Sequence, residues 1–334
     1  MQLEREIGKS GIKASAVGLG TWAMGGWMWG GGDDAASVSA IRAALDAGLT
    51  LIDTAPAYGL GRAEDVVGRA IEGRRDEVVL VTKCGLVWDG QGGWPGGRPF
   101  VDQDGKMIHR YLGAQSVRDE LDASLRRLRT DHVDVLITHW QDPTTPIAET
   151  MGALLSLKQE GKARAVGISN ASADDLNAYI AAGQVDCVQE AYNMLDRGLE
   201  KTLLPICRRE GISVISYSSL ALGLLTGRIG PDREFTGDDL RRSNPRFSVE
   251  NRSRVSSFAA EIVPLARRHK AEVGEVVIAW TLAQPGITFS LCGARNAAQA
   301  AENARAGEIS LSADELAVID AAITAHLGPV AAAA

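Results

Sequence analysis

Four side chains that can transfer or stabilise a proton stand where three successive apolar runs of the sequence end. They are Asp53, Tyr58, Lys83 and His139. The apolar runs have the length and β-branched content of buried strands, and each is followed by a loop and a helical pattern. In a barrel of alternating parallel strands and helices, the carboxyl ends of the strands converge on one face, where the chemistry is done. The sequence therefore predicts that the four side chains share one site.

An acid, a phenol, an amine and an imidazole in one site suit the reduction of a carbonyl group. A free phenol has a pKa of ~10, and a neighbouring ammonium favours the phenolate, so Lys83 is expected to lower the pKa of Tyr58. Asp53 would hold Lys83 charged, and His139 would donate a hydrogen bond to the carbonyl oxygen as it gains negative charge. With a hydride donor beside the carbonyl, the set reduces an aldehyde or ketone to an alcohol. Taken singly, such residues are more often caps or solvated groups, but four together at consecutive strand ends favour the catalytic interpretation.

Composition narrows the class of protein. The 334 residues carry a net charge of −7 and contain 45% hydrophobic residues. This balance, without a long basic run, argues against a nucleic-acid partner. No stretch approaches the ~18 uncharged apolar residues that span a membrane. The four cysteines form no paired motif and the five histidines have no metal-type spacing, so we expect a reduced cytoplasmic protein without a metal site.

Helix and strand patterns alternate along nearly the whole chain, which predicts a single (β/α)8 barrel domain over residues 1–334. An N-terminal hairpin over 2–13 is expected to cap the bottom of the barrel, and extra helices to follow the last strand. Long loops are expected over 84–112 and 226–251. Strands are expected over 14–19, up to 53, up to 83, up to 139, and over 163–168, 185–189, 213–217 and 288–293. Helices are expected over 36–47, 64–71, 116–128, 147–159, 172–181, 199–209, 255–269, 275–282, 297–304 and 313–325.

The glycines near the start of the chain do not make a dinucleotide-binding Rossmann motif. Gly18-Leu19-Gly20 follows a strand but lacks the third glycine at the required spacing. A barrel more often binds phosphate in the loops after its seventh and eighth strands. These loops read 217–223 and 293–296 here, and Arg295 precedes a short helix whose N-terminus also favours an anion. The small residues in them are equally suited to making tight turns.

Several segments, in order along the chain, resemble the aldo-keto reductase family. They are Asp53-Thr54-Ala55 with Tyr58-Gly59, Lys83, Gly167-Ile168-Ser169-Asn170, Tyr217-Ser218 with Leu224-Leu225-Thr226-Gly227, and Gly293-Ala294-Arg295 with Gln299, Glu302 and Asn303. The resemblance covers about residues 2–325. Thr21-Trp22, Gly25-Gly26-Trp27 and His139-Trp140 are most similar to a bacterial branch that contains stress-response and inositol-locus reductases.

The resemblance implies a catalytic tetrad of Asp53, Tyr58, Lys83 and His139, with Tyr58 as the general acid. It implies that a nicotinamide cofactor contacts Gly20, Thr21, Trp22, Asp53, Ser169, Asn170, Gln189, Tyr217, Ser218, Leu220, Gly223, Arg228, Gly293, Arg295, Gln299, Glu302 and Asn303. Ser219 stands where the family often has proline, so the loop over the pyrophosphate is expected to be looser. NADPH is the expected cofactor, because the guanidinium of Arg295 suits its 2′-phosphate; NADH is the second candidate.

The substrate is the least specified part of the prediction. Tryptophans in the expected top-face loops predict a substrate pocket made of Trp22, Trp29, Trp88 and Trp140, suited to a sugar-like or cyclic carbonyl compound. Some of these rings are equally suited to packing the loops together. Two other functions stay open: a cofactor-binding regulatory subunit resembling potassium-channel β-subunits, and an unrelated barrel lyase or isomerase with Lys83 as a Schiff-base amine. The sequence does not indicate an oligomeric state.

Overall fold

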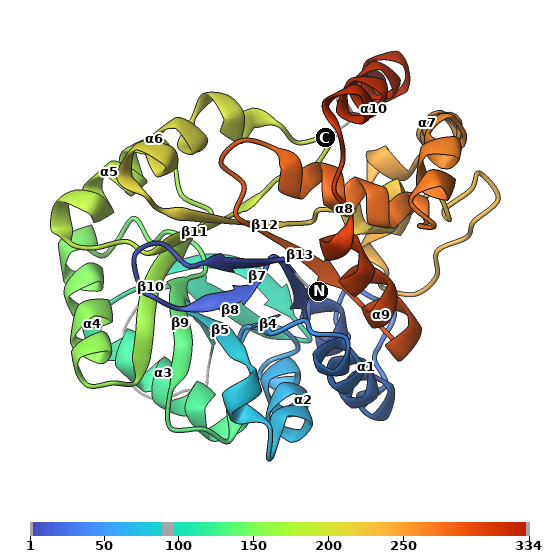
Figure 1. Ribbon diagram of the computed structural model, residues 1–334. Coiled ribbons are helices and arrows are strands. Elements are labelled where there is room, and N and C mark those ends of the chain that lie inside the picture. The colour runs from blue at the N-terminus through green and yellow to red at the C-terminus, as the bar shows by residue number, and fades with distance from the viewer. Residues whose placement is uncertain (1–2, 89–96, 332–334) are drawn as a thin grey trace.

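A closed barrel of parallel strands forms the centre of the protein. The computed structural model describes residues 3–88 and 97–331, and Figure 1 views the barrel end-on. Around the barrel the strands follow the order β10-β11-β12-β13-β3-β4-β5-β9. They span β3 (Val17–Gly20), β4 (Leu51–Asp53), β5 (Val79–Cys84), β9 (Val133–Thr138), β10 (Ala163–Ser169), β11 (Cys187–Ala191), β12 (Ser213–Tyr217) and β13 (Phe289–Gly293). The predicted (β/α)8 architecture is confirmed.

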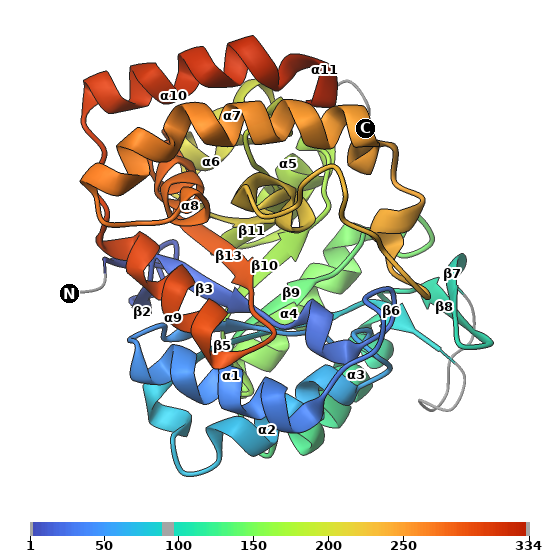
Figure 2. The same cartoon turned by 90° about the vertical axis from the view of Figure 1, so that its right-hand side faces the viewer.

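Helices surround the barrel and cover the outer faces of its strands. They are α1 (Asp34–Asp46), α2 (Arg62–Ile71), α3 (Ala114–Leu128), α4 (Ile147–Gln159), α5 (Ala173–Ala182), α6 (Leu203–Glu210), α7 (Val249–Arg268), α8 (Val273–Ala283), α9 (Ala297–Arg305), α10 (Ala313–His326) and α11 (Gly328–Ala331). The long helices α7 and α10 lie side by side (Figure 2). The helices expected after the last strand, over 297–304 and 313–325, are α9 and α10, whereas the short helix α11 was not expected. Helix α7 begins at Val249 rather than at the expected Val255.

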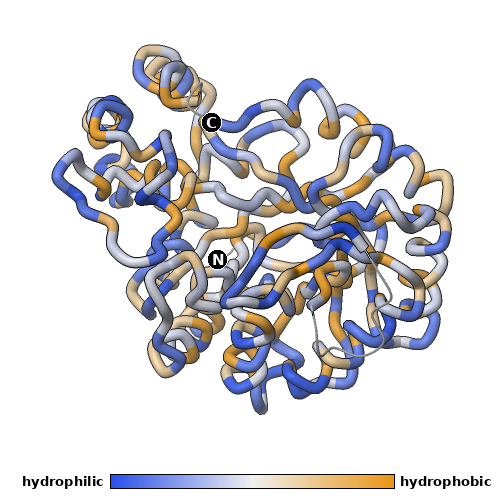
Figure 3. Tube along the Cα trace, turned by 180° about the vertical axis from the view of Figure 1, so that it is seen from behind, coloured by the Kyte–Doolittle hydropathy of each residue, from blue (hydrophilic) through white to orange (hydrophobic). Residues whose placement is uncertain are grey.

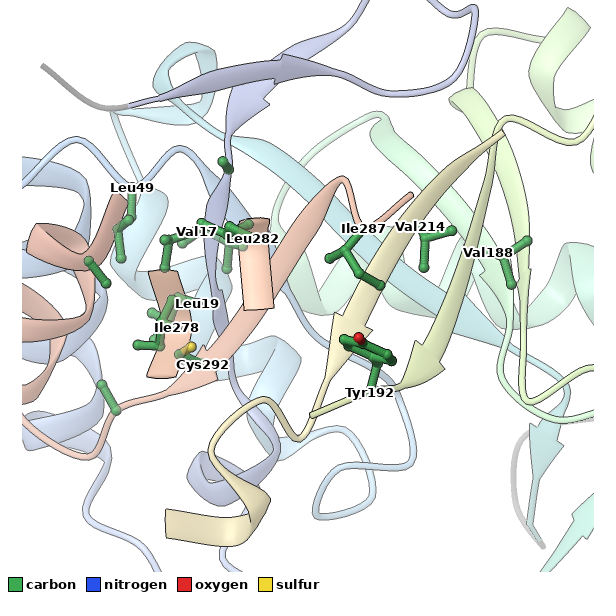
Figure 4. Close-up of a cluster of buried hydrophobic side chains, with 14 of the residues drawn as sticks. Val17, Leu19, Leu49, Val188, Tyr192, Val214, Ile278, Leu282, Ile287 and Cys292 are labelled. Carbon is green, nitrogen blue, oxygen red and sulfur yellow. The ribbon is translucent and has the colours of Figure 1, made fainter. Parts of the chain in front are cut away.

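Two apolar layers hold the barrel together. The first lies between strands and helices, where Val17 and Leu19 of β3 face Ile278 and Leu282 of α8 (Figure 4). The second fills the barrel interior, with members such as Leu51 and Phe289. Strands buried on both faces read as continuous apolar runs, which is why they were recognisable in the sequence. The surrounding helices mix hydrophilic and hydrophobic residues along their length (Figure 3).

The N-terminal hairpin closes the bottom of the barrel, as predicted. Strands β1 (Glu4–Glu6) and β2 (Lys13–Ser15) pair antiparallel. Ile7 and Ile12 are buried within the interior apolar layer. The Arg5 guanidinium donates to the carbonyl oxygens of Ile287 and Thr288 at 2.8 and 2.9 Å, just before β13 begins. The hairpin is therefore fixed to the N-terminal ends of the strands, opposite the predicted site.

The expectation of a loop over 84–112 is wrong for 84–88 and 97–112, which contain a small antiparallel sheet, and residues 89–96 lie outside the described residues. Strands β6 (Leu86–Val87), β7 (Arg98–Gln103) and β8 (Lys106–Arg110) are arranged in the order β6-β8-β7. Figure 2 shows this sheet (cyan) at the opposite end of the barrel from the hairpin β1–β2 (blue). The turn between β7 and β8 is Asp104-Gly105, with both residues at positive φ (53° and 79°). Asp-Gly is the strongest short-range signal for a tight hairpin turn, and it was overlooked.

Several of the remaining connections contain short 3₁₀ helices. They span Trp22–Gly25, Arg75–Glu77, Gly198–Lys201, Ala221–Thr226, Leu240–Arg242, Pro245–Phe247 and Ala306–Glu308. Two of them, at 240–242 and 245–247, lie in the expected loop over 226–251. Within residues 3–88 and 97–331, no helix is long and apolar enough to cross a membrane.

Candidate active site

The four predicted proton-handling side chains come together at the carboxyl ends of β4, β5 and β9. Asp53 is the last residue of β4, Lys83 lies next to the end of β5, and His139 directly follows β9. The hydrogen bonds between β5 and β9 continue one residue beyond the end of β9, because the His139 N–H donates to the Cys84 carbonyl oxygen at 2.8 Å. Tyr58 lies in the turn that follows β4, and its ring meets the His139 ring edge-on at 5.5 Å between centroids. The strand-end argument thus predicted their proximity correctly.

Lys83 is held on three sides by oxygen atoms. Its Nζ donates to the two carboxylate oxygens of Asp53 at 2.7 and 2.8 Å and to the Thr54 carbonyl at 2.9 Å. Lys83 is 1% exposed and Asp53 3% exposed. All three protons of the ammonium therefore have acceptors, and the buried charge has a paired counter-charge. Nζ lies 5.0 Å from the centre of the Tyr58 ring.

The expected lowering of the Tyr58 pKa by Lys83 is wrong. Burial, and then the negative charge of Asp53, hold the pKa of Tyr58 well above its usual value of 10. The physical reason is that Asp53 compensates the charge of Lys83, so that desolvation of the phenolate dominates. Burial also lowers the pKa of Lys83, although Asp53 opposes this shift. Burial, and then the charge of Lys83, lower the pKa of His139 well below 6.5, so its imidazole is neutral at neutral pH.

A cavity of about 750 Å³ opens above these residues. This volume lies within the roughly 300–1,000 Å³ that small-molecule and cofactor sites occupy. Its lining includes three members of the tetrad, which are Asp53, Tyr58 and His139. It also includes most of the other predicted site residues: Gly20, Trp22, Trp29, Trp140, Ser169, Asn170, Gln189, Tyr217, Ser218, Leu220, Gly223, Arg228, Gly293, Arg295, Gln299, Glu302 and Asn303.

Three predicted residues do not line this cavity. Lys83 lies behind Tyr58, as described above. The Thr21 hydroxyl points to the backbone and donates to the Asp53 carbonyl at 2.9 Å, which makes it a support of the β4 end. Trp88 is buried against Ala57, Leu86 and Ile108. The prediction of Trp88 as a substrate-pocket residue is therefore wrong, because its ring packs the small sheet onto the barrel.

The nicotinamide-holding residues expected from the family form one hydrogen-bonded group. Asn170 donates from Nδ2 to the His139 carbonyl at 2.8 Å and accepts from the Tyr217 hydroxyl at 2.7 Å. The Ser169 hydroxyl donates to the Gln189 carbonyl at 2.7 Å. The Gln189 amide donates to Asp53 at 2.7 Å. Asn170 adopts φ of 54°, a left-handed conformation that asparagine tolerates better than most residues.

The loop after β12 has an unusual backbone. Ser218, Ala221 and Leu222 have φ between 47° and 57°, and Gly223 has φ of 90°. The Ala221 and Gly223 N–H groups donate within this loop, to the carbonyl oxygens of Ser218 and Leu220 at 2.7 and 2.9 Å, which closes it into a tight turn. Ser219, expected to loosen this loop, is anchored by side-chain contacts: its buried hydroxyl accepts a hydrogen bond from Ser290 at 2.9 Å and lies 3.3 Å from the Ser216 hydroxyl.

Positive charge gathers at one end of the cavity. The Arg295 guanidinium lies 5.2 Å from the centre of the Trp29 ring. Burial and then the charge of Arg241 lower the pKa of Arg295, with Arg233 contributing in the same direction. Arg233 and Arg241 also line the cavity, and sequence reasoning missed both because they lie in an aperiodic polar segment. Arg228 forms a bidentate ion pair with Glu302 at 2.9 and 2.6 Å.

These features fit a phosphate-bearing dinucleotide. The arginine end of the cavity offers positive charge to a phosphate, Ser218, Leu220 and Gly223 of the loop after β12 line the cavity, and Nδ1 of His139 is buried without a hydrogen-bond partner among the described residues. No group of three or more potential metal ligands occurs within residues 3–88 and 97–331.

Comparison with known proteins shows one protein family. The model of the Aldo/keto reductase family matches residues 16–324. An NADH-specific methylglyoxal reductase of Escherichia coli (strain K12) is 39% identical over 312 residues, which are 92% of this chain and 94% of that protein. The structure of a glycerol dehydrogenase from Gluconobacter oxydans has a TM-score of 0.86 at 35% identity, covering 97% of this chain and 96% of that one. An aldo-keto reductase from Klebsiella pneumoniae in complex with NADPH has a TM-score of 0.71 at 30% identity, covering 96% and 95%.

Proposed function

This chain belongs to the aldo/keto reductase family, and we propose that it reduces an aldehyde or ketone to an alcohol with NADPH and with Tyr58 as the proton donor. The observation that carries the proposal is the placement of Tyr58, His139 and Asp53 on the cavity wall, with Lys83 paired to Asp53 behind it. We also infer that the whole chain acts as one barrel domain.

NADPH, when bound, supplies the hydride that reduces the carbonyl carbon. Tyr58 then transfers its proton to the carbonyl oxygen. Its raised pKa keeps that proton in place at neutral pH until negative charge develops on the substrate. The neutral imidazole of His139 donates a hydrogen bond to the same oxygen, and Lys83, 5.0 Å from the Tyr58 ring, stabilises the phenolate left behind.

The cofactor is proposed to lie along the cavity from the tetrad to the arginine end. Ser169, Asn170 and Gln189 would hold the nicotinamide carboxamide, with Tyr217 against the ring. Ser218, Leu220, Gly223 and Arg228 would surround the pyrophosphate. The adenosine end would contact Arg295, Gln299, Glu302 and Asn303, and Gly20, Trp22 and Gly293 would complete the walls.

Cofactor choice is proposed to favour NADPH, because Arg295 lies among further cationic side chains. The Escherichia coli relative is named as NADH-specific, whereas the Klebsiella pneumoniae structure holds NADPH, so cofactor choice needs its own test. Trp22 and Trp140 line the cavity beside the tetrad and suit a small cyclic or sugar-like carbonyl substrate.

A Schiff-base mechanism at Lys83 is disfavoured. An amine nucleophile needs a free lone pair and access to substrate. Lys83 makes three hydrogen bonds, is almost fully buried and is not among the cavity-lining residues.

The direct test is NADPH consumption with a panel of aldehydes, ketones and sugars, for wild type and Tyr58→Phe. The variant keeps the ring and loses only the phenolic proton, so kcat should fall about a hundredfold or more while the Kd for NADPH stays unchanged. A variant that retains more than about a tenth of wild-type kcat would exclude Tyr58 as the acid. NADPH binding without turnover of any carbonyl compound would instead favour a regulatory subunit.

A further inference from the structure

Arg110 forms a compact cluster with two aromatic rings at the edge of the cavity. Its guanidinium carbon lies 4.3 Å from the centre of the Phe100 ring and 4.5 Å from that of the Trp140 ring. The two rings are 5.2 Å apart between centroids and tilted by 45°. One cation therefore contacts both rings at once, within the ~6 Å over which cation–π attraction acts.

The cluster joins two separate parts of the fold. Phe100 lies on β7 and Arg110 ends β8, both in the small sheet. Trp140 directly follows His139, beyond the end of the barrel strand β9. Phe100 and Trp140 line the cavity, whereas Arg110 is not among the lining residues. Arg110 is thus placed behind a wall that a carbonyl substrate beside His139 would contact.

The charge of Arg110 has no carboxylate partner among residues 3–88 and 97–331. Its Nε is buried without a hydrogen bond to any of these residues. Across the β7–β8 pair its direct neighbour is another cation, Arg98. Burial, and then the charge of Arg98, lower the pKa of Arg110, although a guanidinium stays protonated at any working pH. Like charges directly opposite one another in a sheet repel, so Arg98 does not stabilise Arg110. The favourable contacts of the Arg110 guanidinium are therefore the faces of the Phe100 and Trp140 rings.

We propose that Arg110 is a positioning residue that fixes Phe100 against Trp140, and that it thereby sets which carbonyl substrates the cavity selects. It acts through the two rings and touches neither substrate nor cofactor. The proposal rests on carbonyl reduction as the proposed function. Under this proposal the ring of an aromatic aldehyde held at the tetrad contacts this wall, whereas a three-carbon aldehyde has no ring to place there. Loss of Arg110 should therefore weaken binding of the larger substrate selectively.

The test compares Arg110→Met, Arg110→Lys and Arg98→Met with benzaldehyde and methylglyoxal as probe substrates. Arg110→Met removes the planar cation, so KM for benzaldehyde should rise about five- to tenfold, while kcat, KM for methylglyoxal and the Kd for NADPH change less than about twofold. Arg110→Lys keeps a cation and should recover part of the loss. Arg98→Met, at the cross-strand neighbour with no ring contact among the described residues, should match wild type.

Equal changes in KM for both aldehydes, or a loss of NADPH affinity, would overturn the proposal, because either indicates general damage to the site. A second measurement does not depend on turnover. Acrylamide quenching of tryptophan emission should increase in Arg110→Met, and this increase should vanish when Trp140→Phe is the background. The same increase in both backgrounds, or none, would contradict the proposed contact. Wild type that reduces neither these aldehydes nor any compound of the carbonyl panel would refute the proposed function, and the quenching experiment alone would then decide on the cluster.

Discussion

Gly25 lies directly against the backbone of Tyr58. A Cβ atom at position 25 would stand 2.6 Å from the Tyr58 carbonyl carbon and 2.8 Å from the Gly59 nitrogen. Both atoms belong to the backbone, so no flexible side chain can move away to make room. The 3₁₀ helix Trp22–Gly25 therefore supports the turn that carries the proposed proton donor, and only glycine permits the contact.

Gly25→Ala should shift Tyr58 and weaken catalysis. The added methyl group must displace backbone, which costs about 1–3 kcal/mol of unfolding free energy in a well-packed region. We expect kcat to fall at least tenfold, because a displacement of about 1 Å in a catalytic group can cost roughly a hundredfold. Urea unfolding and steady-state kinetics measure the two effects. Gly152→Ala, on helix α4 with no atom within 4 Å of the added Cβ, is the matched control.

The Lys83–Asp53 pair gives a prediction on stability that is separate from catalysis. Lys83→Met leaves the Asp53 carboxylate buried beside an apolar side chain, and loss of one partner of a buried pair costs about 3–5 kcal/mol. The double variant Lys83→Met/Asp53→Asn removes both charges and should be more stable than Lys83→Met alone. Unfolding free energies by urea titration test this order. A double variant at least as unstable as Lys83→Met would mean that the unpaired charge is not the cause.

Glu190 gives a prediction on pH. It is buried next to Gln189, and the Ala171 N–H donates to its carboxylate at 2.8 Å. Burial raises the pKa of Glu190 to about 7. The unfolded chain releases this proton above pH ~4.5, whereas the folded protein holds it up to a pH of about 7. The free energy of unfolding therefore falls as the pH rises between these two values.

Glu190→Gln imitates the neutral acid and should lose that pH dependence. Relative to wild type, the variant should gain unfolding free energy between pH 5 and pH 8, by roughly 3 kcal/mol at most. Urea midpoints at several pH values measure the difference. Glu250→Gln, at an exposed residue paired with Arg254, serves as the control. A difference between Glu190→Gln and wild type that is flat with pH would show that Glu190 ionises normally.

The sequence predicted the barrel and the meeting of Asp53, Tyr58, Lys83 and His139 at one end of it, because both depend on one local pattern. An apolar run that ends in a polar residue, such as the run before Lys83, indicates where a buried strand ends. Barrel topology then brings these ends together without further information. Trp88 was misplaced because an aromatic residue does not reveal which way its ring points. The Tyr58 pKa was misjudged because its largest cause is the burial of the phenol, and the sequence does not state how completely packing removes that group from water.

Arg295 offers the sharpest test of cofactor choice. Its guanidinium lies over the Trp29 ring, its backbone N–H donates to Gln299 at 2.8 Å, and Arg233 and Arg241 line the same cavity. The 2′-phosphate of NADPH carries negative charge that this end can pair with, whereas NADH presents only a hydroxyl group there. A hydrogen bond to a charged group contributes roughly 1.5–3 kcal/mol, so Arg295→Ala should raise the Kd for NADPH about ten- to a hundredfold and the Kd for NADH by less than threefold.

Titrations followed by tryptophan emission measure both constants, and Arg242→Ala, at an exposed arginine that is not among the cavity-lining residues, should leave both unchanged. Equal losses for the two cofactors would show that Arg295 does not contact the phosphate. Tighter binding of NADH than of NADPH by wild type would refute the cofactor preference and leave carbonyl reduction intact.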